Sequence, residues 1–226
     1  MPPFAAVVDH HHEVLAPWSE LRRELTEAPT VWCLDYHTDT MPCFRNTLPP
    51  PEKGAYLETA DVTAAISRLR HDEHFDWALC AGVIKEAFIG VAGEDCGVTA
   101  DEKLQVFRDE TFPSGEIILN HPEEFRPFAE TVLESSFLQK LFPRLPVPGE
   151  PYILDIDCDF FQCGKALHPQ DDTIIRQLAA NAALVTLSRE SDWVRILKLP
   201  GEEISGEYLA AEFCRIFLPP PHSVSF

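Results

Sequence analysis

Short, continuous apolar runs separated by stretches of helical periodicity constrain the fold of this chain more than any other feature. Such runs occur at Phe4–Val8, Thr30–Leu34, Pro151–Ile156 and Leu184–Leu187. A strand that is apolar on both faces must be buried on both faces, as in a parallel sheet covered by helices. The sequence therefore predicts an α/β protein, specifically a three-layer α/β/α sandwich with a mainly parallel sheet.

Apolar residues at helical spacing predict helices between these strands, at Glu13–Leu25, Ala60–Leu69, Glu123–Leu141, Asp171–Ala182 and Gly206–Leu218. Two further strands are predicted at Glu116–Leu119 and Trp193–Leu197, whereas Ala78–Val91 fits either a helix or a strand. The chain has 226 residues and no internal repeat, so we expect one domain over residues 1–226.

Charge is the compositional feature that bears most on function. The 37 Asp+Glu outnumber the 18 Lys+Arg and give a net charge of −19. Such a surface repels phosphate backbones and attracts cations or basic peptides, although acidity also serves solubility alone. We therefore expect no nucleic-acid partner.

The sequence also indicates the cellular compartment. No apolar run approaches the roughly 18 residues of a membrane helix, and the N-terminus lacks the pattern of a signal peptide. The seven cysteines form no CxxC pair, which argues against a zinc ribbon and favours buried, reduced thiols. We expect a cytoplasmic protein that does not bind membranes.

Three of the predicted strands end in acidic residues and histidines, in the segments Asp9–His12, Asp35–Asp39 and Asp155–Asp159. Carboxyl ends of parallel strands gather at one edge of a sheet, where ligands bind. In extended chain, alternate side chains share a face, so Asp35, His37 and Asp39 are expected to converge. The same spacing brings Asp155 and Asp157 together.

Carboxylates gathered at such an edge indicate a divalent cation. A buried ionised carboxylate is unfavourable by several kcal/mol unless it is neutralised, and neither aspartate motif contains a lysine or arginine. Oxygen-rich sites with some imidazole suit manganese, iron or zinc better than copper. Each motif alone is more typical of a solvated turn, but three at strand ends predict a metal centre.

The same residues resemble the arginase, agmatinase and deacetylase superfamily. LDYHTD (34–39) is similar to its DxHxD signature, LDID (154–157) to its second aspartate pair, and DHHH (9–12) to its Gly-Gly-Asp-His segment. VVDHHHEVL, DEHFDWALCAG and ILDIDCDFF give a stronger resemblance to a small arginase-related family that includes peptide arginases. The likeness runs from about Val7 to Ser191, and it implies an arginase-like fold.

The resemblance implies two Mn²⁺ ions per chain. Asp35 and Asp155 are expected to bridge them. Asp39 and one histidine of the triplet are expected to complete the coordination of one ion, and His37 and Asp157 that of the other.

The ligand histidine is expected to be His11, with His10 and His12 as open alternatives. Asp159 is expected to orient a ligand without contacting the metals.

The implied reaction is hydrolysis of an arginine residue in a precursor peptide to ornithine and urea by a metal-bridging hydroxide. Asp39, His37 and Glu190 are the expected catalytic residues, and Asp39 is expected to hold the proton of the attacking water. Glu73, Asp76 and Glu190 are expected to bind the cationic substrate.

The sequence departs from arginases in ways that keep other functions open. It is shorter and lacks counterparts of the loops that grip a free amino acid, which favours an arginine-containing peptide as partner. The shuttle histidine of arginases has no clear match.

The alternatives are a ureohydrolase acting on a small guanidino compound, a one-zinc deacetylase-like amide hydrolase and a non-enzymatic metal- or peptide-binding domain. The measured metal content distinguishes two of these functions: about two manganese ions per chain would indicate a ureohydrolase, and one zinc ion would indicate a deacetylase-like hydrolase. Whether the chain forms a homo-oligomer stays open.

Overall fold

A six-stranded sheet forms the centre of the protein, for which the computed structural model describes residues 4–43, 59–93, 99–111 and 121–218. Its strand order is β1-β6-β5-β2-β3-β4, and every neighbouring pair is parallel. The strands are β1 (Phe4–Val8), β2 (Thr30–Asp35), β3 (Glu86–Val91), β4 (Leu104–Phe107), β5 (Tyr152–Asp157) and β6 (Leu184–Ser188). The parallel sheet predicted from continuous apolar runs is confirmed.

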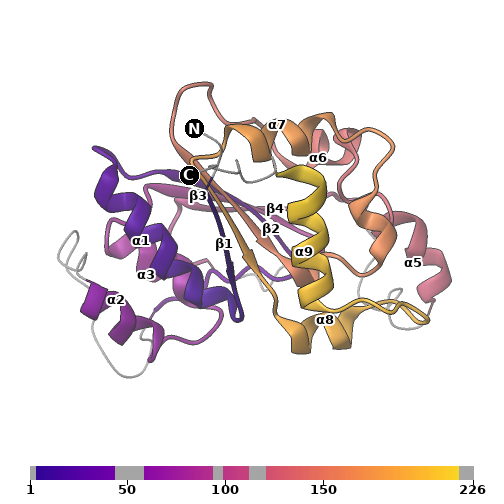
Figure 1. Cartoon of the computed structure of the whole chain (residues 1–226), viewed down its shortest axis with the longest axis horizontal. Coiled ribbons are helices and arrows are strands. Elements are labelled where there is room, and N and C mark those ends of the chain that lie inside the picture. Colours follow the sequence, from indigo (N-terminus) through magenta and orange to yellow (C-terminus); the bar gives the residue numbers. More distant parts are fainter. Residues whose placement is uncertain (1–3, 44–58, 94–98, 112–120, 219–226) are drawn as a thin grey trace, which may run out of the picture.

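Helices cover both faces of this sheet, as Figure 1 shows. One side carries α1 (Leu15–Glu24), α2 (Thr59–Ile66) and α3 (His74–Cys80). The other carries α5 (Pro122–Ala129), α6 (Ser135–Leu141), α7 (Thr173–Asn181), α8 (Ser191–Leu197) and α9 (Gly206–Phe217). Short 3₁₀ helices η1 (His11–Val14), η2 (Cys158–Phe160) and η3 (Gly164–Leu167) follow β1 and β5.

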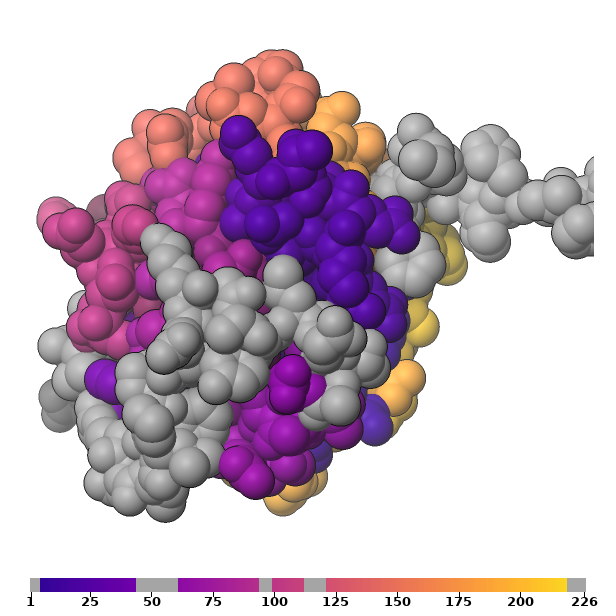
Figure 2. Space-filling view, turned by 90° about the vertical axis from the view of Figure 1, so that its left-hand side faces the viewer, coloured from indigo at the N-terminus to yellow at the C-terminus, as the bar shows by residue number. Residues whose placement is uncertain are grey.

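A separate hydrophobic core lies on each face of the sheet. Trp18, Phe75 and Ile89 belong to the core beneath α1 and α3, whereas Phe160 and Phe213 belong to the core on the opposite face. Figure 2 looks onto the first side, where the indigo N-terminal residues lie beside purple and magenta residues of the next third of the chain. The predicted three-layer α/β architecture is therefore confirmed. None of the helices in the described residues combines the length and the apolar character that a bilayer span requires.

Two predicted elements are wrong. Trp193–Leu197 is not a strand but most of helix α8; Val194 is buried while Ile196 is 60% exposed, a one-sided burial that suits a helix on the sheet. The predicted helix Glu123–Leu141 is two helices, α5 and α6. The first ends at Ala129, where the Thr131 hydroxyl and backbone N–H donate to the Phe128 carbonyl oxygen.

Other boundaries shift for local reasons. The ambiguous stretch Ala78–Val91 contains the end of α3 and all of β3, separated at Gly82, whose φ of 69° suits a glycine just past a helix. Strand β4 was not predicted from the sequence, and the predicted strand Glu116–Leu119 lies outside the described residues.

Candidate metal centre

The histidine triplet forms a tight turn directly after β1. The Glu13 carboxylate accepts hydrogen bonds from the backbone N–H groups of Asp9 (3.0 Å) and His10 (3.1 Å), which closes the turn. This turn buries His11, which is 1% exposed, while the side chain of His10 is 63% exposed. Of the three histidines, His11 is therefore the one directed into the edge of the sheet.

Four carboxylates surround the His11 ring. Its Nε2 lies 2.7 Å from Asp155 Oδ2. Its Nδ1 lies 3.0 Å from Asp39 Oδ2, 3.1 Å from Asp157 Oδ2 and 3.4 Å from Asp35 Oδ2. When Nε2–H donates to Asp155, the lone pair of Nδ1 faces the other three carboxylates, which is the orientation of a metal-ligating imidazole.

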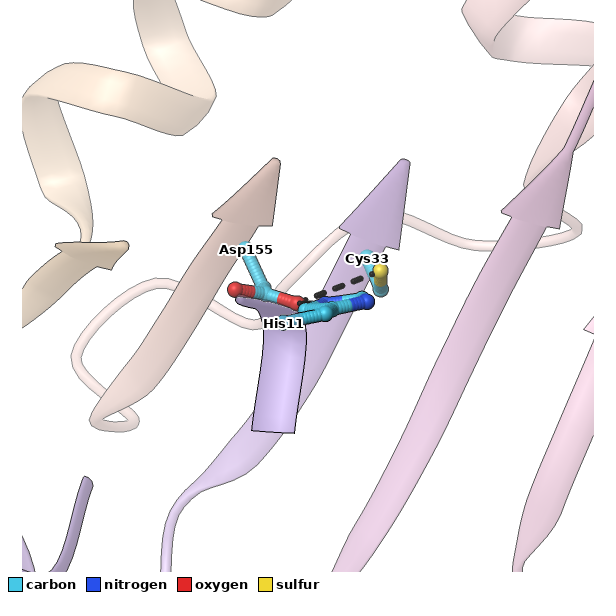
Figure 3. Close-up of side chains that lie close together, drawn as sticks. All are labelled: His11, Cys33 and Asp155. Carbon is cyan, nitrogen blue, oxygen red and sulfur yellow. Dashed lines mark hydrogen bonds and ion pairs between the residues drawn. The ribbon is translucent and has the colours of Figure 1, made fainter. Parts of the chain in front are cut away.

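Asp155 differs from the other aspartates because protein donors engage both of its oxygens. Oδ1 accepts from the Thr186 hydroxyl, and Oδ2 accepts from Cys33 Sγ at 3.3 Å as well as from His11. The parallel register explains these contacts, since Cys33 pairs with Asp155 and Asp155 with Thr186 across three strands. Figure 3 shows Asp155 and Cys33 pointing from neighbouring strands toward the His11 ring. Asp155 thus supports His11 from the side opposite Nδ1.

A second group shares Asp35 with the first. His37 Nδ1 lies 2.9 Å from Asp159 Oδ2 and 3.9 Å from Asp35 Oδ1, whereas Asp35 Oδ2 faces His11. The ligand atoms of His11, Asp35 and Asp157 lie within 4.8 Å of one another, and so do those of Asp35, His37 and Asp159. The site therefore consists of two overlapping sets of metal donors with Asp35 between them.

The DxHxD segment reaches this arrangement differently from the sequence prediction. Strand β2 ends at Asp35, the chain bends at Tyr36 and His37, and Asp39 has a left-handed backbone with φ of 48°. The extended alternation expected for Asp35, His37 and Asp39 is therefore wrong beyond the strand end. His37 turns toward Asp159, whereas Asp39 turns toward His11.

The electrostatics of these residues favour a bound cation. Burial, reinforced by neighbouring carboxylates, raises the pKa of Asp35 to about 7 and that of Asp157 to about 8. Burial also raises the pKa of Asp159 to about 6. In the part of the chain that the structure describes, Asp35 Oδ2 is buried and has no hydrogen-bond donor. A divalent ion would satisfy that oxygen and stabilise the ionised carboxylates, so these residues fit a metal centre.

His74 closes the site from α3. Its ring centroid lies 4.3 Å from that of His11, and its Nδ1 lies 3.0 Å from the His71 carbonyl oxygen. Burial, followed by the proximity of His11, lowers the pKa of His74 to about 3, so this imidazole is neutral at physiological pH. The neutral His74 ring packs against the His11 ring and adds no charge to the site.

The three predicted substrate-binding acids lie in different surroundings. Glu190 is at the site: its Oε1 accepts from the His11 backbone N–H at 2.7 Å, and its Oε2 lies 3.8 Å from His10 Nδ1. Glu73 precedes α3 and accepts from the Arg70 backbone N–H at 3.0 Å. The Asp76 carboxylate accepts from the Cys43 backbone N–H at 2.7 Å. The structure therefore brings Glu190, but not Asp76, to the metal donors.

Two groups at the site were missed in the sequence. Trp193 lies with its ring centroid 4.8 Å from that of His37, but its segment was assigned to a strand. Thr186 joins the site through Asp155 and accepts a hydrogen bond from Trp18 Nε1 at 3.1 Å. Position 186 lies on a predicted strand, but its register with Asp155 is a tertiary property that no local pattern encodes.

Comparisons with known proteins give limited matches. No protein-family model matches the chain, and a search of curated proteins finds no match. Among solved structures, proclavaminate amidino hydrolase from Streptomyces clavuligerus aligns with 93% of this chain and 61% of its own, at 14% identity and a TM-score of 0.44. A hypothetical agmatinase from Burkholderia thailandensis aligns with 95% of this chain and 56% of its own, at 14% identity and a TM-score of 0.45. The chain spans less than two thirds of the length of either protein.

Proposed function

We propose that this chain is a two-metal hydrolase that acts on guanidinium groups, with manganese as the metal and an arginine residue of a peptide as substrate. One observation carries the proposal: Asp35 is shared between a His11–Asp157 group and a His37–Asp159 group. Two imidazole–carboxylate sets with a common buried aspartate are suited to two adjacent divalent ions. The resemblance of the LDYHTD and ILDIDCDFF segments to arginase-type proteins supports the same chemistry.

The proposed metal ligands are the side chains whose nitrogen or oxygen lone pairs are not already used by hydrogen bonds from the protein. His11 Nδ1, Asp39 and Asp157 would hold one ion, His37 Nδ1 and Asp159 would hold the other, and Asp35 would contact both. This assignment leaves Asp35 as the one bridge, moves Asp157 to the ion held by His11 and makes Asp159 a ligand of the other ion. Asp155 is left out because its oxygens are engaged by Thr186, Cys33 and His11. Hard oxygen donors with two imidazoles suit manganese.

A pair of divalent ions supplies Lewis acidity and activates water at neutral pH. The chain supplies the remaining requirements. Asp39 is placed beside His11 Nδ1 and is proposed to hold the proton of the attacking water. His74, neutral and buried, keeps the wall of the site free of a competing positive charge.

Recognition of a guanidinium group is proposed to use charge and an aromatic face. The site presents carboxylates from three strand ends, and Trp193 stands next to His37 where a planar cation stacks favourably. Glu190 borders the same site, and its Oε2 lies 3.8 Å from Nδ1 of the exposed His10. A peptide-borne arginine requires an open approach, which the absence of arginase-type amino-acid loops in the sequence favours.

Mass spectrometry of arginine-containing peptides incubated with manganese-loaded protein tests the proposal. The expected product has lost the elements CH₂N₂ per arginine, with release of one urea. Parallel reactions contain free arginine, a simple alkylguanidine or an acetyl-lysine peptide, and Asp35→Asn is the inactive control. Turnover of the acetyl-lysine peptide alone, with one zinc bound per chain, would instead identify an amide hydrolase. Turnover of small guanidines alone would remove the peptide from the proposal.

A further inference from the structure

A second group of metal-binding side chains lies at the far end of α3 and is not part of the proposed catalytic centre. It consists of Cys43, Asp76 and Cys80, whose ligand atoms all lie within 4.8 Å of one another. Asp76 and Cys80 are four residues apart on α3 and therefore share one face of the helix. Cys43 lies on the segment that follows the DxHxD motif.

We propose that Cys43, Asp76 and Cys80 form a binding site for a thiophilic divalent cation such as Zn²⁺. Two sulfur donors and one carboxylate oxygen are a donor set that zinc accepts, with a fourth position left for water. A tetrahedral zinc ion with bonds of about 2.0–2.3 Å holds its ligand atoms about 3.3–3.8 Å apart. The three donor atoms lie within 4.8 Å of one another, so a bound ion would draw them together by at most about 1.5 Å.

The surroundings of Asp76 favour a cation over a disulfide. Its Oδ2 accepts from the Cys43 backbone N–H at 2.7 Å, which fixes the carboxylate, and its Oδ1 lies 3.8 Å from Cys80 Sγ. A disulfide would remove the thiol proton that faces this buried carboxylate, whereas a cation would compensate its charge.

A cation bound at the proposed site would cross-link the segment that follows the DxHxD motif to α3. That segment is already attached by the hydrogen bond from Met41 N to the Asp72 carbonyl (2.9 Å) and by the Cys43–Asp76 contact. The first residue of α3, His74, packs against His11 in the catalytic centre. A cation at the last turn of α3 would therefore stabilise the loop that presents His37 and Asp39.

Cobalt substitution tests the site directly. Reduced, metal-free protein is titrated with Co²⁺, and the intensity of the sulfur-to-cobalt charge-transfer band is expected to correspond to one thiolate-bound Co²⁺ per chain, in addition to any Co²⁺ that the catalytic centre binds. The band is expected to disappear in Cys43→Ser and in Cys80→Ser. It is expected to persist in Cys214→Ser, a matched half-buried thiol, and in Cys33→Ser, which removes the thiol beside the catalytic centre.

Three further readouts make the outcome decisive. Asp76→Asn keeps the acceptor for the Cys43 N–H but loses the charge, and it should weaken Co²⁺ binding by about 10-fold or more. His11→Ala should keep the band, which separates this site from the catalytic centre. Variants are compared only when their metal-free melting curves match the parent. A missing band in reduced, folded parent protein, or a band that survives both Cys43→Ser and Cys80→Ser, overturns the proposal.

Discussion

Replacing Asp155 and Asp159 in turn distinguishes a bridging aspartate from one that positions His11. In Asp155→Asn, the amide oxygen can still accept a hydrogen bond from His11 Nε2. The amide NH₂ group then faces the Thr186 hydroxyl, which accepts from Trp18 Nε1 through one lone pair and can accept from the amide through the other. The variant should fold and bind two manganese ions. Loss of the carboxylate behind a ligating imidazole weakens metal binding by about 10–100-fold, or about 1.4–2.7 kcal/mol.

Asp159→Asn should behave differently because it removes a charge that faces His37 at 2.9 Å. Its manganese content is expected to fall from two ions to one per chain. Equilibrium dialysis followed by metal analysis measures both variants, and electron paramagnetic resonance reports whether the ions remain coupled. If Asp155→Asn lost both ions while Asp159→Asn kept two, Asp155 would be the bridge and the geometric assignment would be refuted.

Four other predictions concern stability and recognition. The pKa values of Asp35 and Asp157 are raised to about 7 and about 8, so folding stabilises their protonated forms. Their contribution to the free energy of unfolding is complete below pH 3.8, the pKa of an unperturbed aspartate carboxyl group, and is lost as the pH rises through 7–8. The melting temperature of metal-free protein should therefore fall by roughly 10 °C or more from pH 5 to pH 8.5, at about 1.4 kcal/mol per proton and pH unit. Saturating Mn²⁺ should abolish the fall, and a rise in the metal-free protein would contradict this. Trp193→Leu should raise KM for arginine peptides by about 5-fold at constant kcat, the value of a cation–π contact near 1 kcal/mol, and an unchanged KM would exclude stacking. Trp18→Phe removes the donor to Thr186 and should lower the free energy of unfolding by about 1–3 kcal/mol in a denaturant titration, with manganese affinity reduced less than in Asp155→Asn. Capture of a basic peptide in stopped-flow experiments should slow as ionic strength rises, whereas a flat response would limit the charge of −19 to a role in solubility.

The sheet was predictable because its signal is local. Runs such as Phe4–Val8 and Leu184–Leu187 are apolar on both faces, and only a covered parallel sheet accommodates them. The short run Trp193–Leu197 misled the prediction, since five apolar-rich residues fit a strand or a helix equally until a neighbour buries one side.

The gathering of acidic residues and histidines at one edge of the sheet was predictable, but not how they pair. The acidic motifs indicated which strand ends carry donors, yet the role of Asp155 depends on the register that sets Thr186 beside it. Likewise, the proximity of Asp76 to Cys43 arises from a tertiary contact between α3 and the segment after β2. From the sequence, Asp76 was expected to bind the cationic substrate because of its negative charge.

In the described chain, the residues other than glycine with a positive φ are Asp39 and Glu190, and both border the proposed centre. A left-handed conformation at such a residue is unfavourable by about 1–2 kcal/mol. A search for heat-resistant variants would thus select glycine at these two positions and erase the carboxylates they carry. Stabilising substitutions should therefore avoid both loops and be made on distant surfaces, such as the exposed side of α7.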